Sequence, residues 1–185
     1  IFRGFECATG DILGWVNSDD LLLPGALENV GRFFALHQDA KWVTGGTLSI
    51  NPHGKYFHNW LGNPRCNLGA SVTFNHLLYL GCPFNQPASF WRRDTFFEVN
   101  GFDRTLRFCF DYDLFFRLSQ KSASANIKQF LACFRVHEKS KSSTIPNIRA
   151  EENELLWGRY GLYNKNKPFR ILARQYYLLF NYLRS

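Results

Sequence analysis

Residues 8–20 read Ala-Thr-Gly-Asp-Ile-Leu-Gly-Trp-Val-Asn-Ser-Asp-Asp, and this stretch decides the fold class. Its apolar part, residues 12–16, predicts a buried strand, which we expect to be central and parallel. The strand ends in a polar turn whose last two residues, Asp19 and Asp20, are adjacent carboxylates. Pro24 and Gly25 follow and predict the start of a helix. Acidic groups at the carboxyl end of a buried strand lie where α/β folds bind ligands.

The carboxylates of Asp19 and Asp20 repel each other unless a proton or a cation neutralises one of them. A hard divalent cation with oxygen ligands suits this role, and a diphosphate is its natural companion. A second interpretation is that the two side chains only cap the helix that follows Pro24. The turn is therefore a candidate site for a metal and a diphosphate.

The composition of the chain is that of one packed domain. It has 185 residues, of which 45% are hydrophobic and 17% aromatic, which argues against disorder. No stretch reaches the roughly 20 apolar residues that span a bilayer, and Arg3, Glu6 and Asp11 interrupt any signal-peptide pattern. Five cysteines without a Cys-x-x-Cys spacing favour reduced thiols and a cytoplasmic location. A location at the inner face of the membrane is compatible with this expectation.

Positive charge is concentrated towards the end of the chain. The net charge is +7, and residues 135–185 hold ten Lys or Arg against four Glu. Such a segment suits phosphates, anionic lipid or nucleic acid, and an ordinary solubilising surface is the simpler alternative. No recognised nucleic-acid motif accompanies the charge, so we expect no nucleic-acid partner.

Apolar periodicity and turn residues predict the order of the remaining elements. We expect helices over residues 24–36, 94–99 and 110–119 and strands over residues 41–50, 88–92 and 127–136. Residues from about 145 onwards are predicted to be helical. Residues 169–183 carry apolar side chains at helical spacing, which favours packing on protein or on a membrane surface.

Three blocks of sequence carry a family resemblance. They are the segment 8–26; residues 86–94 (Gln-Pro-Ala-Ser-Phe-Trp-Arg-Arg-Asp) with 101–103 (Gly-Phe-Asp) and 111–118 (Asp-Tyr-Asp-Leu-Phe-Phe-Arg-Leu); and residues 134–142 (Phe-Arg-Val-His-Glu-Lys-Ser-Lys-Ser). In this order they resemble the family-two glycosyltransferases of the GT-A fold. The resemblance implies a Rossmann-like mixed α/β sheet flanked by helices over residues 1–144, and a helical extension over residues 145–185.

The resemblance also implies a reaction. A sugar passes from a nucleotide-diphosphate donor to an acceptor hydroxyl with inversion, in the synthesis of a cell-surface polysaccharide or glycolipid, and the acceptor is a glycan or is lipid-linked. Family members begin with a strand-helix-strand unit that holds the nucleotide base. Because the match begins just before the strand at residue 12, we expect the sequence to be a fragment that lacks most of this unit.

The resemblance assigns a donor and metal site. Asn17 stands at the first Asp of the family's Asp-x-Asp motif, where it would meet the ribose. Asp19 stands at the second and would bind Mn²⁺ or Mg²⁺, with Asp20 as a further candidate ligand. His137 would complete the metal site, although a lone His is usually structural. Lys139 and Lys141 belong to a basic loop after His137 and would neutralise the departing diphosphate.

The resemblance places the catalytic base at Asp111, and a simple helix-capping role is the alternative. Asp113 falls on another face of the same helix, and we expect it to pair with Arg117 at i+4. Gln86 and Trp91 would border the acceptor. Core packing is an equal alternative for Trp91.

Two other functions stay open. The departures at Asn17 and Phe110 from the family pattern favour a non-catalytic relic that binds carbohydrate or diphosphate. The charge of the last fifty residues is the only support for a nucleic-acid-binding module.

Overall fold

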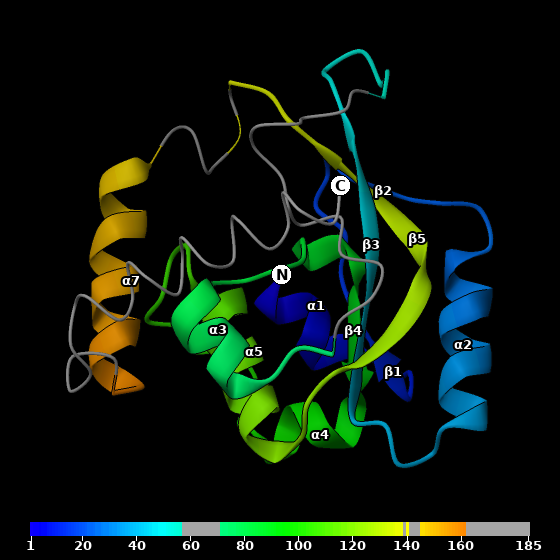
Figure 1. The fold of residues 1–185 in the computed structure, drawn as a ribbon, viewed down its shortest axis with the longest axis horizontal. Helices are drawn as coiled ribbons and strands as arrows, with labels where there is room; N and C mark the ends of the chain where they lie inside the picture. Colours follow the sequence, from blue (N-terminus) through cyan, green and yellow to red (C-terminus); the bar gives the residue numbers. More distant parts are fainter. Residues whose placement is uncertain (57–70, 139, 141–144, 162–185) are drawn as a thin grey trace.

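The computed structural model describes residues 1–56, 71–138, 140 and 145–161, and they form a mixed sheet flanked by helices (Figure 1). Five strands lie in the order β1 (Ile12–Leu13), β4 (Ser89–Arg92), β3 (Trp42–Ile50), β5 (Ala125–Arg135) and β2 (Leu21–Leu22). The β3–β5 pair is parallel, and the other three pairs are antiparallel. The mixed α/β fold expected from the sequence is confirmed.

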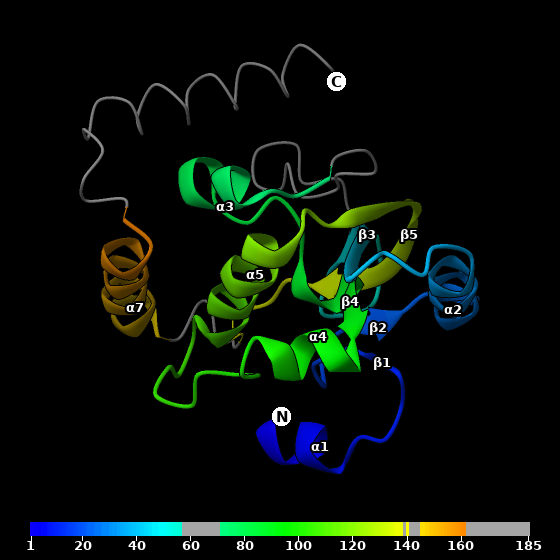
Figure 2. The same cartoon turned by 90° about the horizontal axis from the view of Figure 1, so that it is seen from below.

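Helices cover both faces of the sheet. One face carries α2 (Ala26–Leu36), while the other carries α3 (Phe74–Leu80), α4 (Arg93–Glu98), α5 (Phe110–Lys121) and the short α1 (Phe2–Cys7). A 3₁₀ turn, η1 (Gln86–Ala88), leads into β4. The last described helix, α7 (Pro146–Arg159), stands on the far side of α5 from the sheet (Figure 2).

The alternation of side chains along each strand builds the two halves of the core. Trp42 and Trp91 point to the α5 face, whereas their neighbours Val43 and Phe90 point to the α2 face. The ring of Trp42 stacks on Phe115 of α5 with centroids 6.0 Å apart, and its Nε1 donates to the Ser122 carbonyl at 2.9 Å. These contacts fix α5 against the middle of the sheet.

The expectation that residues 12–16 form a central parallel strand is wrong. The strand is only two residues long, lies at one edge of the described sheet and pairs antiparallel with β4. Its apolar pattern arises because helices cover both faces even at this edge, so Ile12 and Leu13 are packed on opposite sides. Beyond it, a Cβ at Gly14 would lie 2.6 Å from the Phe90 ring, so a side chain here would force that ring to move.

The other predicted elements that fall within the described residues agree with the structure to within a few residues. The helix predicted over 24–36 begins at Ala26, after Gly25 has taken a left-handed conformation at φ 78°. In the described part of the chain, no helix has the length and hydropathy needed to cross a membrane. The cysteines placed by the structure, Cys7, Cys82, Cys109 and Cys133, form no disulfide with one another.

Candidate functional site

Asn17 organises the turn that carries the adjacent carboxylates. Its Nδ2 donates to Asp20 Oδ2 at 3.1 Å and to Gln86 Oε1 at 3.4 Å. Its Oδ1 accepts from Trp15 Nε1 at 3.2 Å, and its backbone carbonyl accepts from the Asp20 amide. The Asn17 amide group thus holds the turn in shape, and its contact with a ribose stays a prediction.

Asp20 anchors the turn to the end of β5. Its side chain is almost fully buried, and Oδ1 accepts from the Arg135 amide at 2.9 Å while Oδ2 accepts from Asn17. Burial raises the pKa of Asp20, although these two hydrogen bonds oppose the shift. Both carboxylate oxygens are engaged within the protein, and a cation would compete with these bonds. The ligand role of Asp20 stays a prediction.

Capping of α2 does not explain the two carboxylates. The N-cap of α2 is Gly25, which has no side chain to offer, and β2 separates Asp20 from the helix. The alternative in which Asp19 and Asp20 only cap this helix is therefore wrong.

Asp19 and His137 meet at the sheet edge although 118 residues separate them. Asp19 Oδ2 lies 2.9 Å from His137 Nε2, and the two side chains are 36% and 22% exposed. His137 lies two residues after the end of β5, beside the turn that Asp20 anchors. The pair is thus reachable from solvent, unlike the carboxylate of Asp20.

Arg135 was not singled out from the sequence, yet it positions this pair. Its Nε donates to the Asp19 carbonyl at 2.7 Å, and its Nη1 donates to the carbonyls of Asn51 and Pro52 at 2.9 and 3.1 Å. One guanidinium therefore ties the acidic turn to the turn after β3. The only signal in the sequence was its position two residues before His137, which is weak.

The geometry of Asp19 and His137 fits a shared divalent cation. Oxygen and nitrogen ligands bind such cations at about 2.1 Å. Two of them at right angles therefore lie about 3.0 Å apart, close to the observed 2.9 Å. A proton held between the two groups fits the same distance. Within the part of the chain that the structure describes, no cluster of three or more His, Cys, Asp or Glu is placed to hold a metal.

The start of α5 lies against the acidic turn through Trp15. The Trp15 ring stacks on Phe110, the first residue of α5, with centroids 5.9 Å apart. Trp15 also donates to Asn17, and its carbonyl accepts from Gln86 Nε2 at 2.8 Å. Asp111 is half-buried in the first turn of α5 and follows Phe110 directly in the sequence. Residues from the first two sequence blocks meet around Trp15, with Asn17 from the first and Gln86 and Phe102 from the second.

Asp113 has the structural role expected for it. It is fully buried, and Oδ2 pairs with Arg117 Nη2 at 2.6 Å. Its Oδ1 accepts from Arg159 Nη1 at 2.8 Å and from the Tyr160 hydroxyl at 2.7 Å. Burial, followed by the proximity of Asp113, raises the pKa of Tyr160. The predicted pair with Arg117 is confirmed, and Arg159 and Tyr160 donate hydrogen bonds to the same carboxylate.

The structure corrects the assignment of Trp91 to the acceptor site. Trp91 is fully buried between Phe5 and Phe96, so its ring offers no face to a sugar, and the core-packing alternative applies. Gln86 is largely buried, and its amide holds Asn17 and Trp15; its acceptor role stays a prediction. Lys139, Lys141 and the segment 169–183 lie outside the described residues.

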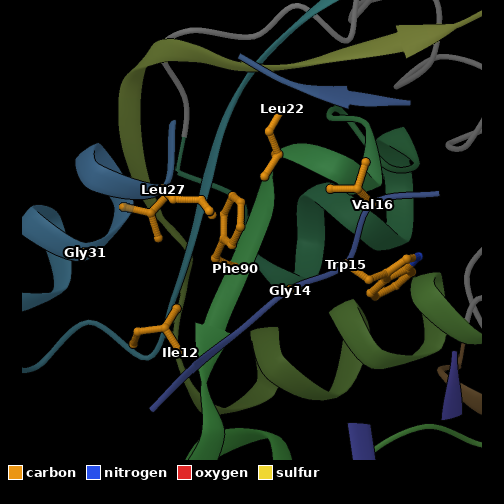
Figure 3. A pocket seen from close by; sticks show the side chains of 9 residues that line it. Ile12, Gly14, Trp15, Val16, Leu22, Leu27, Gly31 and Phe90 are labelled. Atoms are coloured by element: carbon orange, nitrogen blue, oxygen red, sulfur yellow. The ribbon is translucent and has the colours of Figure 1, made fainter. Parts of the chain in front are cut away.

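An apolar pocket of about 300 Å³ adjoins the turn without including its carboxylates. Figure 3 shows Leu22, Leu27 and Phe90 converging on it from β2, α2 and β4. It is lined by Ile12, Gly14, Trp15, Val16, Leu22, Leu27, Val30, Gly31 and Phe90. None of these side chains is charged, so the pocket offers no group for acid–base or metal chemistry.

Comparisons with known proteins bear on the fold of the chain and on the proteins to which it is similar. No model of a protein family matches the sequence. A curated protein of Rickettsia bellii (strain RML369-C), named an uncharacterized glycosyltransferase, is 25% identical over an alignment of 163 residues that covers 85% of this chain. The chain spans 23% of that protein's length. The chain is thus similar to part of a glycosyltransferase.

Solved structures share the fold. A crystal structure of residues 1–349 of S. aureus TarS, a glycosyltransferase, matches 72% of this chain and 38% of its own, with a TM-score of 0.53 and 15% identity. A second TarS structure matches 80% of this chain and 26% of its own, with a TM-score of 0.52 and the same identity. This likeness shows the fold alone, which is the mixed α/β arrangement described above.

Proposed function

We propose that this chain forms the metal-binding and acceptor side of an inverting glycosyltransferase that uses a nucleotide-diphosphate sugar. The observation that carries the proposal is the Asp19–His137 pair at the sheet edge, beside the start of the helix that bears Asp111. The similarity to part of a curated glycosyltransferase supports the same reaction class.

Asp19 and His137 would hold Mn²⁺ or Mg²⁺, with Asp20 as the further candidate ligand. When bound, the cation supplies positive charge that stabilises the diphosphate as it departs. Arg135 keeps the Asp19 backbone in place, so the carboxylate is oriented before any substrate arrives. Lys139 and Lys141 are proposed to add charge next to the same diphosphate, and Asn17 to meet the ribose.

Asp111 is proposed as the general base. Its carboxylate takes the proton of the acceptor hydroxyl while that oxygen bonds to the anomeric carbon from the face opposite the diphosphate. The bond from the anomeric carbon to the diphosphate oxygen breaks in the same step. Phe110 is buried and adjacent to Asp111 in the sequence, and we propose that its ring excludes water from one side of this position.

The acceptor is proposed to be a glycan or a lipid-linked glycan in polysaccharide or glycolipid synthesis. A cytoplasmic site of action, at the inner face of the membrane, goes with that acceptor. Contact with the membrane through residues 169–183 is part of this proposal. No nucleic-acid partner is proposed.

A non-catalytic relic that binds carbohydrate or diphosphate is the second candidate. Asn17 favours it, because the amide replaces a charged group and is already bonded to Asp20 and Gln86. This candidate predicts binding of nucleotide sugars without turnover.

Removal of the metal tests the proposed function. The full-length protein that contains this chain is incubated with labelled nucleotide sugars, membrane-derived acceptor lipids and Mn²⁺. We expect labelled product, a loss of at least about a hundredfold in rate after addition of EDTA, and recovery with excess Mn²⁺. Turnover that continues unchanged in EDTA would refute the metal-dependent mechanism, and binding without turnover would favour the relic.

A further inference from the structure

Glu152 of α7 binds the backbone that leads into α5. Its Oε1 accepts from the Arg107 amide at 2.6 Å, and its Oε2 accepts from the amides of Phe108 and Cys109 at 2.8 and 2.7 Å. Three consecutive N–H groups thus converge on one carboxylate, which comes from a helix 43 to 45 residues further along the chain. Hydrogen bonds to an ionised acceptor are stronger than those between neutral groups.

These amides have no acceptor from their own helix. Cys109 is the N-cap of α5, and its side chain makes no capping hydrogen bond. Backbone N–H groups at and before a helix start need an outside acceptor, which a nearby side chain usually supplies. Here a carboxylate of α7 takes that place, so the shape of segment 107–109 depends on a distant element.

A second group of contacts fixes α7 to both sides of this segment. Arg159 Nη1 lies 2.8 Å from Asp103 and 2.8 Å from Asp113. Leu156 is fully buried in a cluster with Leu106, Cys109 and Phe110. Glu152 therefore belongs to a helix, α7, that also contacts residues before and after segment 107–109.

The segment held by Glu152 ends two residues before Asp111. Phe110, between them, belongs to the same cluster as Leu156 and stacks on Trp15. A shift of residues 107–109 would move the first turn of α5 and with it the Asp111 carboxylate. It would leave Asp19 and His137 held by Arg135 and β5.

We propose that Glu152 is a positioning residue that holds segment 107–109 so that Asp111 faces the acceptor hydroxyl. This inference rests on the proposed function, in which Asp111 is the base. The inference makes α7 part of the catalytic unit. From the sequence, α7 was expected to belong to a separate helical extension over residues 145–185.

Three variants of the full-length protein test this role. Glu152→Ala removes the acceptor, Glu152→Gln keeps one acceptor oxygen without the charge, and Glu151→Ala removes a neighbouring exposed carboxylate as the control. Turnover is measured with the nucleotide sugar that gives product in the metal-removal assay, binding with uridine diphosphate and Mn²⁺, and amide protection by hydrogen exchange.

We expect Glu152→Ala to lower kcat by about a hundredfold, as a small misplacement of a catalytic group does. The affinity for uridine diphosphate with Mn²⁺ should stay within about twofold, because the donor side is untouched. Amides 107–109 should exchange faster in Glu152→Ala. The kcat and the amide exchange rates of Glu152→Gln should lie between those of the parent and of Glu152→Ala. Glu151→Ala should match the parent in both measurements. If Glu152→Ala fails to fold, Glu152→Gln provides the same comparison.

A double variant separates positioning from general stability. Because Glu152 acts through Asp111, adding Glu152→Ala to Asp111→Asn should lower the residual rate no further. An unchanged kcat in Glu152→Ala, unchanged amide exchange, or a further fall of the same factor in the double variant would each overturn the inference. If Asp111→Asn alone keeps full turnover, the proposed function fails instead.

Discussion

Replacing Asp111 with asparagine should lower the rate of sugar transfer by about a thousandfold, within the range that a general base contributes. The amide has nearly the same shape but cannot take a proton from the acceptor hydroxyl. The donor side, built from Asp19 and His137, stays intact. The rate is measured by transfer of labelled sugar, and donor binding by calorimetry with uridine diphosphate and Mn²⁺.

Asp94→Asn is the matched control for this experiment. Asp94 occupies the first turn of α4 and accepts from the following amide, that of Thr95, as Asp111 accepts from the amide of Tyr112. Asp94 is exposed, and its replacement should leave the transfer rate unchanged. Full transfer activity in Asp111→Asn would remove this residue from the role of base and leave helix capping as its function.

Replacing Asp113 with alanine should lower the free energy of unfolding by about 3–5 kcal/mol, the usual cost of removing one partner from a buried ion pair. Asp113 is fully buried between Arg117 and Arg159, and it also accepts from Tyr160. Without it, Arg117 loses its carboxylate partner, Arg159 keeps Asp103 but loses Asp113, and α7 loses an attachment to α5. Urea unfolding followed by circular dichroism measures the change.

Asp39→Ala provides the control for stability. Asp39 is exposed in the turn between α2 and β3, and its loss should change the free energy of unfolding by no more than about 0.5 kcal/mol. A loss below about 1 kcal/mol in Asp113→Ala would show that the buried network adds little to stability.

Local spacing in the sequence predicted those parts of the site that depend on neighbours along the chain. Asp113 and Arg117 are four residues apart on a helix, and this spacing alone predicted their pair. The motif resemblance suggested Asp19 and His137 for one site, and the fold brings them to 2.9 Å.

Long-range contacts that the resemblance does not imply could not be predicted. Glu152 and Arg135 act on backbone atoms of distant segments, and backbone atoms carry no sequence signal. An aromatic residue near a binding loop can either stack on a sugar or pack in a core, and the sequence pattern is the same for both. In the structure Trp91 packs in the core. An apolar strand is expected at the centre of a sheet because both of its faces are buried there. The strand at residue 12 has the same pattern at an edge, because helices cover both faces of the sheet at that edge.

The most direct measurement is the affinity of the full-length protein for Mn²⁺ in the presence of uridine diphosphate, followed by the electron paramagnetic resonance of free Mn²⁺. The account predicts that Asp19→Asn and His137→Ala each weaken this affinity by at least about tenfold, in the range expected for loss of a ligand or its support. Asp39→Asn, an exposed carboxylate in the turn after α2, should leave it unchanged. If Mn²⁺ binds the Asp19→Asn and His137→Ala variants as tightly as the parent, the metal lies elsewhere and the proposed diphosphate site is wrong.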